Sequence, residues 1–242
     1  MTDTTIDESQ RRAAKVVGFA YLLAMAAAVF AESYVRGQLI VSGNAVETAR
    51  NIMAHERLFR LGIASYLLVA VTDVALITAL YVVLKRINEP LAVFAAFLRL
   101  IETAMNVVPT LASLDVLRLL SGADYLQAFS ADQLQALARL SIGAHGAALL
   151  VAFVFLGLGS AVFGYLWFKS NYVPRTLAAL GVFGSVLIAT GSFAIIIFPS
   201  LARTLSLSYM LPLGVFEVTM GFWLLLKPLR PTAVARTTTV SE

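Results

Sequence analysis

The sequence of 242 residues contains no cysteine, only two histidines and few charged side chains. Without cysteine the chain forms no disulfide, and neither thiolate-bound iron–sulfur clusters nor thiol chemistry is available to it. His55 and His145 cannot build a three-histidine zinc site, so no metal is assigned. Charged residues make up 13% of the chain, whereas soluble domains carry about a quarter. The missing charge indicates that a lipid bilayer, rather than water, covers most of the surface.

The sequence also lacks the short motifs that mark common enzymes. It has no Walker loop, no G-x-G-x-x-G, no G-x-S-x-G and no H-E-x-x-H. We therefore assign no catalytic residue and no cofactor, and an enzymatic role is left open but not favoured. The net charge of +4 comes from cations that lie in short clusters beside apolar runs. That pattern is typical of juxtamembrane anchors, so nucleic acid is not an expected partner.

Six apolar runs are long enough, or nearly so, to cross a bilayer as helices, each needing about 20 residues. They are Val16 to about Val35, Leu61–Leu84, Leu91–Leu114, Ala144–Phe168, Thr176–Phe198 and Leu207–Leu226. The runs predict an all-α, polytopic transmembrane helix bundle in one domain over residues 13–230. The polar, Thr-rich tails over residues 1–12 and 231–242 are predicted to be disordered and cytoplasmic.

Lysine and arginine predict the orientation. With the N-terminus inside, the cytoplasmic tails and turns hold ten of them and the opposite loops seven, while Arg99 lies within a span. This bias places both termini in the cytoplasm. An alternative is that the first run is a cleaved signal peptide, because it has a basic start and a small-residue site at Val29-Phe30-Ala31. Five spans would then remain.

Two loops on the outer side are longer than turns. Residues 44–60 and 124–140 both carry apolar side chains at near-helical spacing. In the second loop, Ser130 and Gln133 have the spacing of a capping box. Both loops are predicted to form amphipathic helices at the membrane interface. The alternative is that they extend the neighbouring spans.

Ionisable residues inside the spans are the informative ones, because they are costly in lipid and usually face the bundle interior. The prediction rests on four of them, Asp73, Arg99, Glu102 and Glu217, and Asn106 lies one turn from Glu102. At about 1.5 Å per residue, all four ionisable groups lie about 13–18 Å from the cytoplasmic ends of their helices. His145, at the outer end of its run, does not share this depth. The sequence thus predicts a polar cluster near the midplane.

One arginine cannot neutralise three carboxylates. If the four groups meet, balance requires protonated acids, a bound cation or the exit of one side chain to water, and protonation is the least costly of these. The cluster is accordingly a candidate ligand- or ion-binding site. The competing interpretation is that it only holds the bundle together, and catalysis is a third and weaker one.

Several segments resemble a bacterial membrane family known as domain of unknown function 4386. They are Phe59-Arg60-Leu-Gly62, Phe97-Leu-Arg99-Leu-Ile-Glu102, Val173-Pro174-Arg175, and Glu217 followed by Trp223-Leu-Leu-Leu-Lys227, together with Asp73. The resemblance covers about residues 16–227 and departs at Pro228, where a glycine is usual. It implies a protein of the bacterial cytoplasmic membrane and supplies no activity.

Two function hypotheses follow. The first is a small transporter, or an ion- or ligand-binding membrane protein, that uses the midplane cluster with a proton or small molecule as its ligand. The alternative is a non-catalytic scaffold or accessory subunit whose charges are structural. In either case lipid is the expected partner, and a second copy of the chain is a candidate partner.

Overall fold

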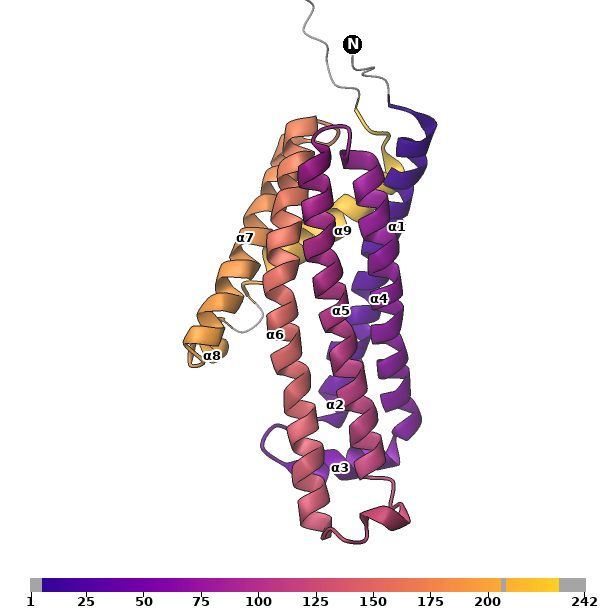
Figure 1. Ribbon diagram of the computed structural model, residues 1–242, viewed down its shortest axis with the longest axis vertical. Coiled ribbons are helices and arrows are strands. Elements are labelled where there is room, and N and C mark those ends of the chain that lie inside the picture. Colours follow the sequence, from indigo (N-terminus) through magenta and orange to yellow (C-terminus); the bar gives the residue numbers. More distant parts are fainter. Residues whose placement is uncertain (1–5, 206–207, 231–242) are drawn as a thin grey trace, which may run out of the picture.

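The computed structural model describes residues 6–205 and 208–230, so most of the predicted tails, residues 1–5 and 231–242, lies outside the described residues. The described part is helical and contains no strand. Long helices lie side by side in one bundle (Figure 1). The elements are α1 Glu8–Val29, the π-helix η1 Phe30–Arg36, α2 Gly37–Leu39, α3 Ala45–Ala54, α4 Glu56–Leu84, α5 Glu89–Leu119, η2 Asp124–Leu126, α6 Ala131–Ser170, α7 Arg175–Ile197, α8 Leu201–Leu205 and α9 Leu211–Leu226.

Five of the helical segments are long and apolar enough to cross a membrane. They are the continuous helix from Glu8 to Leu39, followed by α4, α5, α6 and α7. Helix α9 has 16 residues, about 24 Å, which is short of a hydrocarbon core of about 30 Å. The prediction of an all-α membrane-type bundle is confirmed, and each of the six predicted runs is helical. The sixth is shorter than predicted because Pro212 occupies the first turn of α9.

The first helix begins earlier than predicted. Asp7 caps it, since its side chain accepts a hydrogen bond from the backbone N–H of Gln10 while the Gln10 side chain accepts one from the Asp7 N–H. This reciprocal pair is a capping box, and it stabilises a helix start at Glu8. The predicted disordered tail over residues 1–12 is therefore wrong for Glu8–Arg12, which form the first turn of α1 and the residue that follows it.

The two long outer loops differ from each other. Residues 45–54 form a separate helix, α3, which runs across the end of the bundle (Figure 1). For residues 124–140 the structure agrees with the second alternative, because Ala131–Ser170 is one unbroken helix of 40 residues and residues 131–140 therefore extend the neighbouring span. Ser130 and Gln133 do form the expected capping box. No proline interrupts residues 131–170, so the helix that begins at Ala131 continues to Ser170, where Asn171 is its C-cap.

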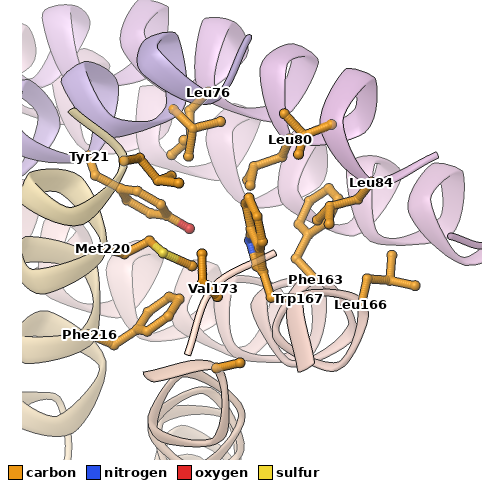
Figure 2. Packing of buried hydrophobic residues seen from close by; sticks show 14 of the residues in the cluster. Tyr21, Leu76, Leu80, Leu84, Phe163, Leu166, Trp167, Val173, Phe216 and Met220 are labelled. Atoms are coloured by element: carbon orange, nitrogen blue, oxygen red, sulfur yellow. The ribbon is translucent and has the colours of Figure 1, made fainter. Parts of the chain in front are cut away.

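Two apolar cores lie one after the other along the bundle. The first packs α1, α4, α6 and α9 around side chains such as Tyr21, Leu80, Trp167 and Met220 (Figure 2). The second, near α3, includes Leu39, Ile52, Phe59, Val116 and Ile142. On α4 the second core contains Phe59 and Ile63, and the first core begins at Leu76, so residues 64–75 lie between the two cores. Asp73 on α4 and Arg99 and Glu102 on α5 lie in the intervening stretch, whereas Glu217 lies on α9 among residues of the first core.

Candidate functional site

Arg99 is the centre of the site, and it connects three helices. It projects from α5 and is buried, with 3% of its surface exposed. Its Nη2 lies 3.3 Å from Asp73 Oδ1 on α4, and its Nη1 donates to Ser160 Oγ on α6 at 3.2 Å. Its Nε lies 3.5 Å from Glu102 Oε2, one turn further along α5. The guanidinium thus faces two carboxylates and a hydroxyl inside the bundle.

Glu102 and Asn106 extend the cluster along α5. They are four residues apart and share a helix face, and the Asn106 amide donates to Glu102 Oε1. Among the described residues, Arg99 Nε, Glu102 Oε2 and Asn106 Oδ1 are buried without a hydrogen-bond partner, although Arg99 Nε and Glu102 Oε2 lie only 3.5 Å apart. Most buried polar atoms have such a partner. The cluster therefore retains one donor and two acceptors that make no hydrogen bond.

Close packing of α5 against α6 holds the arginine in place. A Cβ atom on Gly159 would lie 2.8 Å from Arg99 Cγ and 3.1 Å from the Ala95 carbonyl oxygen. Only glycine leaves room for the arginine stem to pass at that point of α6. One turn beyond Asn106, Pro109 lies inside α5. Since proline has no N–H, it removes the helical donor from the carbonyl of Met105.

Glu217, on α9, lies at the edge of the cluster. It interacts electrostatically with Arg99 and Asp73, and also with Tyr21 on α1. Within residues 6–205 and 208–230, it forms no hydrogen bond and no ion pair within 4.0 Å. It is partly exposed, unlike the other three ionisable groups. Of the five predicted site residues, the structure brings Asp73, Arg99, Glu102 and Asn106 into contact and places Glu217 beside them.

The charges of this site do not balance if every acid is ionised. One guanidinium contacts two carboxylates, and Glu217 lies at the edge of the cluster, so the four groups together then carry a net charge of −2. An uncompensated buried charge costs several kcal/mol or more. Two additional protons would bring the cluster to neutrality without any movement of the chain.

A second polar cluster was not predicted. Glu32 on η1, Tyr66 on α4 and the buried His145 on α6 meet between the two cores, nearer to the end that α3 crosses. His145 was predicted to lie apart from the midplane groups, and in the structure it forms no contact with them. Glu32 has a clear signal in the sequence, because it is an ionisable residue inside the run from Val16 to about Val35 and lies four residues before Arg36.

Neither cluster has the form of a metal site or a large pocket. Among the described side chains, no three from His, Asp and Glu gather closely enough to hold a metal ion. A surface groove of about 630 Å³ lies along α6, lined by Arg139, Gly143, Ala144 and their neighbours. That groove contains no residue of either cluster.

A bundle of apolar helices that buries an arginine among carboxylates is the architecture of an integral membrane protein. Over residues 16–227 the chain matches the family described as domain of unknown function (DUF4386), and it belongs to that family. The resemblance seen in the motifs is thereby confirmed. No curated protein and no solved structure matches the chain.

Proposed function

We propose that this chain is a multi-pass protein of the bacterial cytoplasmic membrane that acts as a small transporter and binds protons at the carboxyl groups of Asp73, Glu102 and Glu217. In this site Arg99 is the counter-charge and Asn106 the hydrogen-bond partner of Glu102. The observation that supports the proposal most directly is the charge count: one buried guanidinium contacts two buried carboxylates, Asp73 and Glu102, and a third carboxylate, Glu217, lies beside them. A change in protonation alters the charge of the cluster without requiring new space. Such groups near the midplane of membrane proteins commonly form proton relays.

A proton fits this site better than a metal cation does. A metal bound to Glu102 Oε2 would lie next to Arg99 Nε, which is 3.5 Å from that oxygen, and would be repelled by it. A proton on a carboxyl group instead turns an acceptor into a donor, and Asn106 Oδ1 is a buried acceptor on the same helix face without a donor. The proposed ligand is therefore the proton, held as a neutral carboxylic acid.

Infrared difference spectroscopy tests this proposal directly. The protein in lipid nanodiscs is titrated with acid, and the carbonyl stretch of protonated carboxyl groups is followed. We expect a titrating band that Glu102→Gln or Glu217→Gln diminishes. The matched control is Asp115→Asn, because Asp115 forms an i,i+3 pair with Arg118 on the same helix α5 but is exposed. The control should leave the band of the buried acids unchanged.

A structural role is the second candidate function, because Arg99 joins α4, α5 and α6 through its three contacts. A purely structural cluster keeps one protonation state throughout the pH range in which the protein stays folded. Glu102→Gln and Glu217→Gln would then leave the titration unaltered and change only stability. That result would contradict proton binding and establish the scaffold interpretation.

A further inference from the structure

Glu32, Tyr66 and His145 form a hydrogen-bonded cluster in which one ring nitrogen of His145 has no partner among the described residues. His145 Nε2 lies 2.8 Å from Glu32 Oε1 and 3.2 Å from the Tyr66 hydroxyl oxygen. The Tyr66 hydroxyl donates to the same carboxylate oxygen. The His145 side chain is 2% exposed, and its Nδ1 has no hydrogen-bond partner among the described residues.

These contacts determine where hydrogen atoms can lie. The Tyr66 hydroxyl donates its hydrogen to Glu32. If Glu32 is ionised it has no hydrogen to donate, so in its contact with His145 the donor must be Nε2 of the ring. A neutral imidazole with hydrogen on Nε2 has a bare Nδ1. One additional proton at Nδ1 gives imidazolium, whose positive charge lies beside the Glu32 carboxylate. The cluster thus has a defined position for one proton and a counter-charge to hold it.

The local fold gives this site an entrance. Residues 30–36 form a π-helix, in which the Gly37 N–H reaches back to the Glu32 carbonyl. Single turns of this kind are often found at functional sites, because the extra residue changes the direction of side chains. The Glu32 side chain is 41% exposed, while its Oε2 lies 3.3 Å from Arg36 Nε. Glu32 therefore extends from the exterior to a buried histidine.

We propose that Glu32, Tyr66 and His145 form a proton-binding site of their own, separate from the midplane cluster, in which His145 carries the proton and Glu32 is its counter-ion and entrance. The proton comes from water, and the ring changes from neutral imidazole to imidazolium. The charged and titratable groups recorded around the ring are Glu32 and Arg36 from η1 and Tyr66 from α4. From the described parts of α3, α5 and α7, which also pack on α6, no hydrogen bond or ion pair reaches the ring. The site does not depend on the function proposed for Asp73, Arg99 and Glu102.

Nitrogen NMR of the histidine rings tests the proposal. The chain contains only two histidines, so His55→Gln leaves a single ring, that of His145. In nanodiscs with ¹⁵N-labelled histidine, we expect the ring to gain one proton as the pH falls. In Glu32→Gln, half-protonation should need about tenfold more acid, because the imidazolium loses its counter-charge. Tyr66→Phe removes one hydroxyl and should change the same midpoint by less.

Glu56→Gln is the matched control. Glu56 is also paired with an arginine four residues away and its side chain is also 41% exposed, but its contact is with Arg60 and not with a histidine. It should leave the His145 midpoint unchanged. A ring that keeps one protonation state at every pH at which the protein is folded would overturn the proposal. A protonation midpoint of His145 that is the same in the parent, in Tyr66→Phe and in Glu32→Gln would also overturn it. If the Glu32 variant does not fold, the comparison of Tyr66→Phe with the parent decides alone. None of these outcomes decides the proposal for Asp73, Glu102 and Glu217, which the infrared experiment tests separately.

Discussion

Replacing Arg99 by methionine removes the only cation from a cluster of buried acids. Asp73 and Glu102 are 5% and 3% exposed, so water cannot replace the lost charge. Removing one partner of a buried ion pair costs about 3–5 kcal/mol, because the other charge stays buried without compensation. Since two carboxylates lie within 4.0 Å of the guanidinium, we expect a loss at the upper end of that range.

Two further variants separate charge from packing. Arg99→Met combined with Asp73→Asn and Glu102→Gln contains no charge at these positions, and we expect it to regain most of the lost stability, since uncharged replacements of buried ion pairs are often neutral. The control Arg118→Met breaks an exposed pair with Asp115 on the same helix and should cost at most about 1 kcal/mol.

Equilibrium unfolding in mixed detergent micelles, followed by the fluorescence of Trp167 and Trp223, measures these differences. The proposed role of the charge is refuted if the free energy of unfolding of Arg99→Met lies within about 1 kcal/mol of that of the parent, because that is the largest loss expected for the exposed control. It is also refuted if the triple variant is as unstable as the single one. Packing of the arginine stem, and not its charge, would then be what the bundle requires.

Two substitutions of glycine test the packing around the sites. Gly159→Ala should destabilise the bundle by about 1–3 kcal/mol in the same unfolding assay, because the added methyl group meets Arg99 Cγ at 2.8 Å. Gly143→Ala, on the open side of the same helix with nothing within 4 Å, should stabilise it by up to about 1 kcal/mol. Gly184→Ala places a methyl group 2.5 Å from the backbone nitrogen of Leu213 and should separate α9 from α7. The change in Trp223 fluorescence should then occur at a lower detergent concentration than in the parent. Equal stability of Gly159→Ala and Gly143→Ala would contradict the predictions for α6. A Trp223 signal in Gly184→Ala that is unchanged from the parent would contradict the prediction for α9.

The helices could be predicted because apolar length is a strong signal in lipid. Each predicted run coincides with a helix, and turns such as Asn88-Glu89-Pro90 begin a helix as expected, with Asn88 accepting from the Leu91 N–H. Helix ends were harder to place. Asp7 and Gln10 have the spacing of a capping box, but they stand in a polar segment that hydropathy assigns to a tail.

The midplane cluster could be predicted in part, because depth follows from counting along each helix. Counting placed Asp73, Arg99 and Glu102 at one level, and the structure joins them. Depth does not determine which way a side chain faces around its helix. That is why Ser160 was not expected as a partner of Arg99, and why Glu217 reaches the edge of the cluster without contacting it.

The second cluster could have been predicted only in part. Glu32 is an ionisable residue inside the run from Val16 to about Val35, but it lies in a π-helix, and the extra residue per turn defeats any prediction of facing from a period of 3.6 residues. Tyr66 is a weaker signal, since tyrosine is common in membrane helices. Yet Tyr66 and Asp73 are seven residues apart on α4, which places them on one face and about 10 Å apart along the axis. On α5, Asn106 lies four residues beyond Glu102, toward the end of the bundle that α3 crosses. The two polar clusters therefore occupy one interior face between the apolar cores. A proton held by His145 would lie within two helical turns, measured along α4, of the level at which Arg99 balances its acids.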